Sequence, residues 1–191
     1  MPLVGPELAL HVREHLPQVL LGLVEEMSHV LIERLAEAEL LMRRALKIDE
    51  VSFGPDHPNV AIRLNNLAAL LRDTNRPSEA ELLIRRALSI DEASYGPDHP
   101  EVATSLNNLA ELLRVTNRVS EAEPLSRRHV EIFVLFTVRT GHEHPHLRAA
   151  LGNYAVILEE LGFDASATES RLRELLQPLN PAKPVQPLQT Q

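Results

Sequence analysis

The chain of 191 residues has no cysteine and no tryptophan, and aromatic residues make up only 3% of it. Without cysteine it can form no disulfide, and it offers neither a thiolate metal ligand nor a cysteine nucleophile. The scarcity of aromatic residues argues against a β-sandwich, which is rich in Val, Ile, Tyr and Phe. Leu and Ala supply most of the apolar content of 44%, which suits closely packed helices. The composition therefore favours an all-α fold.

Long apolar runs and an excess of positive charge are lacking as well. No stretch approaches the roughly 18 uncharged apolar residues that a membrane span requires. The first residues, MPLVGPELALHVREHLP, have no basic region ahead of an apolar core, so they do not form a typical signal peptide. The net charge of −8 is a poor match for a phosphate backbone. We therefore expect a cytoplasmic protein that engages neither membrane nor nucleic acid.

The chain does contain a long internal repeat. Residues 37–78 and 79–120 are two copies of one 42-residue sequence, and they are identical at 32 of the 42 positions. A fixed period of about 20 to 50 residues is typical of repeat architectures, in which each unit contacts only its neighbours. The sequence therefore predicts a solenoid, and its function becomes a question about the surface that stacked repeats present.

Each copy predicts two helices. The connector GPDHP ends one helix, and Asp56 or His57 can cap the next, with Pro58 at its first position. Asn75 can take a left-handed conformation in the following turn. Ser78 and Glu81 have the spacing of a capping box, so we expect Ser78 to begin the second helix.

A third, weaker copy follows at residues 121–163, with an insertion of three residues that changes the offset to 45. The insertion lengthens a helix whose segment 132–138 (IFVLFTV) is apolar nearly all round, so we expect it to be buried on most sides. Its first-helix segment starts in the run GHEHPH, where Pro145 predicts the same helix start as in the other copies.

The ends of the chain depart from the repeat. Terminal repeats are atypical, so residues 1–35, with a helix over 17–33, are interpreted as a degenerate N-terminal cap, and 164–177 as a C-terminal capping helix. The tail, 178–191, carries a proline at every third position from Pro178 to Pro187. This spacing is typical of polyproline II. An unstructured end and a proline-rich ligand for an aromatic groove both remain open.

The repeats resemble the tetratricopeptide repeat, through small Ala68, Ala80 and Ala87 with leucines between them. The 42-residue period, the LNNLA core, the EAE-x-L-x-RRAL segment and the GPDHP connector look specifically like the longer repeats of kinesin light chains and their bacterial relatives. The resemblance covers about residues 36–163. It implies an all-α, right-handed α-solenoid of antiparallel helix pairs, whose first helices line a concave groove that binds peptides or partner proteins.

Differences between the copies point to the binding face. Residues needed for stacking should repeat, whereas residues that touch a partner need not. In the first helix most differences fall on one helical stripe around an Asn that does repeat, and in the tetratricopeptide pattern this face is the concave one. The predicted groove residues on this stripe are Ile62, Asn66, Ala69 and Asp73, then Thr104, Asn108, Glu111 and Val115, and finally Ala149, Asn153 and Val156.

Asparagine offers two donors and an acceptor, which suits it to grip an extended peptide backbone. We expect this role for Asn66, Asn108 and Asn153, with Asn65 and Asn107 beside them. The alternative is that one Asn of each pair bonds the neighbouring helix and holds the repeat angle. Two cations at the groove edge could receive an acidic side chain, or could simply favour the helix C-terminus; they are Arg72 and Arg114.

Other polar clusters do not favour chemistry. The Arg pairs of the second helices follow Glu residues at the i,i+4 spacing of intrahelical ion pairs, so a neutralised surface is expected. The run containing His142, His144 and His146 could ligate zinc, but it aligns with the connector GPDHPE. The sequence has no phosphate loop and no distinct carboxylate pair, so we expect no enzymatic activity, no cofactor and no metal.

The sequence therefore predicts a protein–protein interaction scaffold that binds a peptide or partner protein in its groove. An alternative is an oligomerisation or sensor module of a larger regulatory protein. Self-association would then use the apolar ends of the solenoid.

Overall fold

The computed structural model describes the backbone of residues 6–179, with the side chains of residues 26, 27 and 29–179. Every regular element in this part of the chain is a helix, as predicted. The elements are α1 (Pro6–Phe53), α2 (Pro58–Asp73), α3 (Pro77–Tyr95), α4 (Pro100–Val115), α5 (Val119–Thr140), α6 (Leu147–Glu160), α7 (Ala165–Leu175) and the 3₁₀ turn η1 (Gln177–Leu179).

Helix α1 differs from the prediction because it is continuous over 48 residues. Residues 17–33 belong to this one helix, and no turn separates them from the first repeat. The physical reason is local: the stretch LAEAEL at 35–40 consists of strong helix formers and lacks the Gly-Pro connector that ends the later helices. Residues 6–44 lie in one compact unit and residues 45–179 in a second. The capping role of residues 1–35 stays a prediction.

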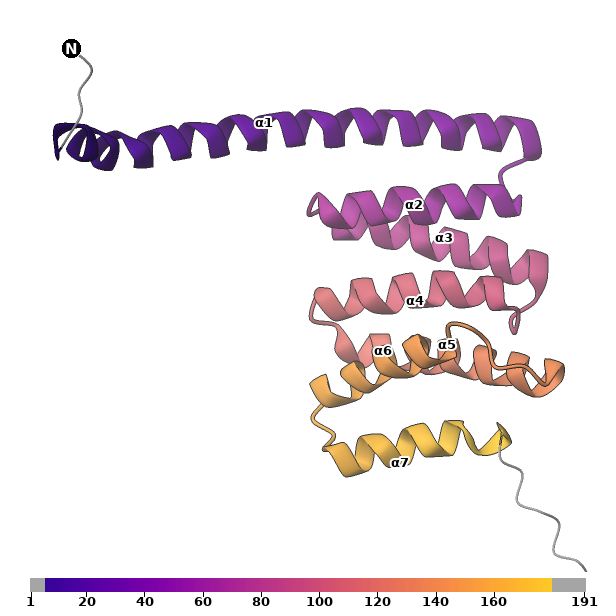
Figure 1. Ribbon diagram of the computed structural model, residues 1–191. Helices are drawn as coiled ribbons and strands as arrows, with labels where there is room; N and C mark the ends of the chain where they lie inside the picture. Colours follow the sequence, from indigo (N-terminus) through magenta and orange to yellow (C-terminus); the bar gives the residue numbers. More distant parts are fainter. Residues whose placement is uncertain (1–5, 180–191) are drawn as a thin grey trace, which may run out of the picture. The chain divides into compact units, whose positions relative to one another are not determined.

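The second unit is a stack of helices in which each packs against the next. The α2–α3 and α4–α5 pairs have the most extensive contacts, and α3–α4 and α5–α6 join successive pairs. Figure 1 shows α2 to α7 as this series of short helices, coloured from purple to yellow. The architecture is the predicted solenoid of antiparallel helix pairs.

Leucines and small alanines form the core, as the periodicity predicts. Leu64, Leu67, Ala68 and Leu71 of α2 are fully buried, and Ala87 of α3 is buried with them. A larger side chain at these alanines would separate two helices, so the alanines set how closely the pairs approach.

The connectors are held by their histidines, as expected for caps. Nδ1 of His57 accepts a hydrogen bond from the backbone N–H two residues further on, at 3.1 Å, and His99 does the same at 3.2 Å. Each imidazole also stacks on the last aromatic residue of the preceding helix, Phe53 or Tyr95. One ring therefore caps the new helix and packs against the end of the old one.

The turn within each pair has the predicted left-handed Asn, with φ of 59° at Asn75. The prediction that Ser78 begins the second helix is wrong, because α3 has Arg76 as its N-cap and Pro77 in its first turn. Proline is preorganised for this position, which moves the helix start ahead of Ser78. Glu81 then serves a different purpose, as an acceptor for arginines.

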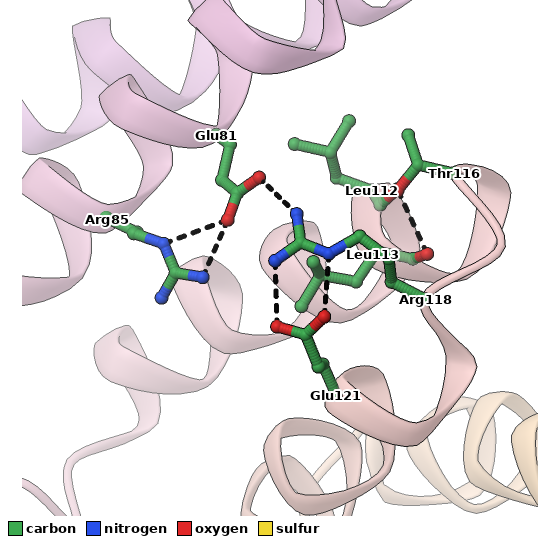
Figure 2. Close-up of polar contacts among 7 residues, drawn as sticks. All are labelled: Glu81, Arg85, Leu112, Leu113, Thr116, Arg118 and Glu121. Atoms are coloured by element: carbon green, nitrogen blue, oxygen red, sulfur yellow. Dashed lines mark hydrogen bonds and ion pairs between the residues drawn. The ribbon is translucent and has the colours of Figure 1, made fainter.

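Ion pairs join successive repeats along the second helices. Figure 2 shows Arg118, at the start of α5, bound to Glu81 of α3 at 2.6 Å and to Glu121 at 2.7 Å, while Glu81 also accepts from Arg85. Arg128 similarly reaches Glu92 of the preceding second helix at 2.6 Å. The predicted i,i+4 pairs within the second helices also form, between Arg43 and Glu39 at 2.8 Å and between Arg85 and Glu81 at 2.6 Å.

The third repeat deviates in its connector. Helix α6 begins at Leu147, two residues beyond the start that Pro145 predicted, because His144 stacks on Phe133 with ring centroids 3.9 Å apart and holds the connector against α5. Residues 132–134 are buried as predicted, but coverage decreases along the helix and Val138 is exposed.

The C-terminal helix α7 starts after Asp164, whose carboxylate accepts a bond from the backbone N–H of Ala167. The first two residues of the predicted tail, Pro178 and Leu179, are ordered, because they belong to the 3₁₀ turn η1. Leu179 packs against the hydrophobic cluster that contains Phe133. The remaining predicted tail, 180–191, lies outside the described residues.

We predict that Ala68→Leu lowers the free energy of unfolding by about 1–3 kcal/mol, because the added atoms would overpack a fully buried helix contact. Its matched control is Ala69→Leu, one residue along the same helix at an exposed position. Urea denaturation of both variants measures the difference. Equal unfolding midpoints would contradict the assigned register of α2.

Candidate binding groove

The predicted groove residues share one surface of the first helices. All those on the variable stripe are exposed or half-buried, in contrast to the buried leucines beside them. They are Ile62, Asn66, Ala69 and Asp73 on α2, Thr104, Asn108, Glu111 and Val115 on α4, and Ala149, Asn153 and Val156 on α6.

Asparagines link these helices to one another. The side-chain N–H of Asn108 donates to Oδ1 of Asn65 across α4 and α2, at 3.2 Å. One step further, Asn153 of α6 donates to Oδ1 of Asn107 at 3.0 Å. Each bond uses one donor of an Asn expected to grip a peptide, and leaves its carbonyl oxygen and second N–H for other partners.

Asn65 holds the neighbouring helix, which is the alternative role considered for the first Asn of each pair. It is buried and donates to Oγ of Ser105 at 2.8 Å, and Ser105 donates to Asp91 at 2.6 Å. Burial raises the pKa of the Asp91 carboxyl, while the bond from Ser105 opposes that rise. By contrast, the exposed amide of Asn66 has no hydrogen-bond partner among the described residues.

The two groove-edge arginines are already paired. Arg72 binds the adjacent Asp73 at 3.0 Å. Arg114 binds Glu111 at 2.8 Å and Glu160 of the next first helix at 2.7 Å, and these hydrogen bonds raise the pKa of its guanidinium. An acidic ligand would have to compete with these carboxylates for either arginine.

Two cavities lie between α4 and α6, and they share Asn107 and Asn153. One, of about 260 Å³, extends toward Glu111 and Arg114, and Val156 also lines it. The other, of about 210 Å³, extends the opposite way and is lined by Thr104, Ala149 and His146 among others. Seven of the fifteen predicted groove residues therefore meet at this step of the stack: Thr104, Asn107, Glu111, Arg114, Ala149, Asn153 and Val156.

Sequence reasoning missed two residues of this groove, Ser126 and His129, which α5 contributes to the two cavities. His129 is only 6% exposed, and its Nδ1 has no hydrogen-bond partner among the described residues. Burial, reinforced by His144 and His146, lowers the pKa of His129 to about 4. The available signal was the change from RRAL to RRHV between the second helices of the copies.

The connector histidines have structural partners. His144 stacks on Phe133, and Nδ1 of His142 lies 2.9 Å from the carbonyl oxygen of Thr140. No three His, Asp or Glu side chains within the described residues form a group that could hold a metal ion.

We predict that stability falls as the pH falls from about 6.5 toward 4. The unfolded chain binds a proton at the usual histidine pKa, whereas buried His129 stays neutral until about pH 4, so acid favours the unfolded state by up to about 3 kcal/mol. Urea denaturation across this range should give a shallower pH dependence for His129→Ala than for the wild type. The exposed His142→Ala is the control, and parallel curves for wild type and His129→Ala would refute the prediction.

Comparison with known proteins agrees with this architecture. The family model described as "Tetratricopeptide repeat" matches residues 27–93 and 83–133, more than half of the chain, so the chain belongs to the tetratricopeptide repeat family. A comparison with curated proteins found no match. Within the described residues, no helix combines the length and apolarity needed to cross a membrane.

Solved structures share the fold. The crystal structure of BtubC (BKLC) from P. vanneervenii is 23% identical, with a TM-score of 0.64 over 83% of this chain. This chain spans 63% of the length of BtubC. The nearly identical TPR-like repeats of a putative kinesin light chain from Podosopora anserina are 20% identical, with a TM-score of 0.57 over 78% of this chain and 71% of that one. The chain therefore shares the fold of these kinesin-light-chain-like repeat structures.

Proposed function

We propose that the chain is an interaction scaffold that binds an extended peptide segment of a partner protein along the first helices α2, α4 and α6. Tetratricopeptide repeats mediate protein–protein interactions and typically form non-catalytic scaffolds. The finer assignment, a peptide in this groove, is supported mainly by the row of asparagines, whose remaining donors and acceptors face the same surface as the variable stripe.

The geometry fits an extended backbone. A peptide strand presents N–H and C=O groups at regular intervals, and side-chain amides can satisfy both kinds. Asn66 keeps its full amide free, while Asn108 and Asn153 each keep part of theirs. The variable residues around them would then contact the peptide side chains.

We predict that Asn66→Ala weakens peptide binding by about fivefold or more, because one lost hydrogen bond contributes about 1 kcal/mol. Suitable peptides come from a random dodecapeptide phage library selected on the purified chain, and fluorescence anisotropy gives their dissociation constants. The matched control is Asn59→Ala, another exposed asparagine of α2 that lies off the stripe. Equal affinities for both variants would count against the groove.

Self-association is a second candidate, and the first unit supports it. Large apolar side chains of α1 are exposed there, including Met27 at 71%, Ile32 at 65% and Leu40 at 59%. Large apolar side chains exposed on one helix can take part in protein–protein contacts.

Multi-angle light scattering over a wide concentration range tests this candidate. We predict a mass above that of the monomer, which Ile32→Glu together with Leu40→Glu should return to the monomer mass. A monomer at every concentration of the wild type would exclude self-association.

A further inference from the structure

Successive first helices form two steps of the stack, α2 to α4 and α4 to α6. The buried residues that the second helix contributes are apolar in the first step and polar in the second. In the first step α3 packs against both α2 and α4 and supplies the buried apolar residues Ile84 and Ala87. Between α4 and α6 the floor comes from α5, and the corresponding positions, 42 residues on, are Ser126 and His129. Both replacements add a polar group at a buried position that is apolar in the other copy.

The buried hydrogen bonds that join α2, α4 and α3 in the first step have no counterpart in the second step. Asn65 donates to Ser105, which donates to Asp91, so this step has a satisfied buried chain of hydrogen bonds. The residues equivalent to Ser105 and Asp91 in the next step are Ala150 and Phe133, which offer no side-chain acceptor.

Asn107 is equivalent to Asn65, and its amide nitrogen consequently has no hydrogen-bond partner among the described residues, although its oxygen accepts from Asn153. The N–H donors of Asn107 are therefore available to a ligand, whereas the equivalent Asn65 uses one of its donors to bind Ser105.

The second step also has open space beside these polar groups. The two cavities, of about 260 and 210 Å³, meet at Asn107 and Asn153, and they are lined by Ser126 and His129 respectively. A polar floor, an unpaired donor and open space thus coincide.

The most buried polar side chains that line this space, Ser126 and His129, are uncharged. Ion-paired Glu111 and Arg114 and apolar side chains such as those of Phe133 and Val156 complete the lining. The hydroxyl of Ser126, the imidazole of His129 and the amide of Asn107 provide both donors and acceptors. His129 is neutral at physiological pH because burial holds its pKa at about 4. The nearby guanidinium of Arg114 is committed to Glu111 and Glu160.

A charged side chain would lose its hydration here without gaining an unpaired counter-ion, whereas a neutral amide would lose less and gain partners. An aliphatic side chain would leave the polar groups of the floor unpaired.

We propose that the cavities between α4 and α6 form a specificity subsite for a primary carboxamide side chain, Asn or Gln, of the bound peptide. This inference rests on the proposed peptide-binding function and deepens it. A carboxamide carries one acceptor and two donors, and it therefore complements the mixed set that Asn107, Ser126 and His129 present.

The test compares matched peptides on matched variants of the full chain. A random dodecapeptide phage library is selected on the wild type, and the recovered sequences should share Gln or Asn at one position. The strongest peptide is then synthesised with that residue, with Glu or Asp in its place, and with Leu. Fluorescence anisotropy measures each peptide on the wild type, on Ser126→Ala, on Ser126→Ala with His129→Ala, and on the exposed control His142→Ala.

We expect the acidic and Leu peptides to bind the wild type and the His142→Ala control at least about tenfold more weakly than the carboxamide peptide. On the double variant this preference should shrink to about twofold, with Ser126→Ala in between. The single variant changes only a hydroxyl, so it keeps the test valid if the double variant is unstable.

The outcomes separate the two proposals. Recovered peptides without a recurrent carboxamide, or an equal preference on wild type and variants, would overturn the subsite, while weaker binding to Asn66→Ala would still support the groove. If no peptide binds the wild type, the proposed function fails and the subsite fails with it.

Discussion

The structure depends on one constraint: no helix of the stack can bury its own apolar face, so each must be covered by its neighbours. Leu64, Leu67 and Leu71 of α2 are fully buried because α3 lies against them, and the same positions recur in α4. Small residues such as Ala68 and Ala110 allow the close approach that this coverage requires. The variable stripe of each first helix lies away from these buried leucines, at exposed or half-buried positions.

The same constraint explains why some polar side chains join neighbouring helices and others face outward. A side chain at the boundary between two first helices can join them or face a ligand, and the asparagine pairs do both. Asn65 is turned inward and joins α2 to α4, whereas Asn66, one residue further along the helix, is exposed. Ion pairs such as Arg118–Glu81 join the second helices on the other side. Stacking contacts therefore repeat, and they leave a separate surface free to vary.

The sequence allowed much of this to be predicted, because identical repeats must use identical contacts. The helix pairs, the buried leucines, the histidine caps and the left-handed Asn75 follow from local rules. The errors arose where several local rules competed: Pro77 rather than Ser78 sets the start of α3, and helix propensity without a connector makes α1 continuous. The groove floor was missed for a different reason, since Ser126 and His129 lie on a second helix and only packing brings them under α4 and α6.

The third repeat shows what a repeat protein gains when one copy diverges. A buried imidazole nitrogen without a partner costs about 1–3 kcal/mol, a cost that the alanine at the equivalent position of the preceding copy, Ala87, does not carry. In a solenoid such a cost stays local, because stability is roughly a sum of repeat and interface terms. The same repeat has added contacts elsewhere: His144 stacks on Phe133, and Tyr154 donates to Glu123 at 2.8 Å. His129 is thus a buried polar residue that departs from the repeat pattern, and new contacts around it offset its cost. Such a departure within an otherwise regular scaffold is expected at a functional site.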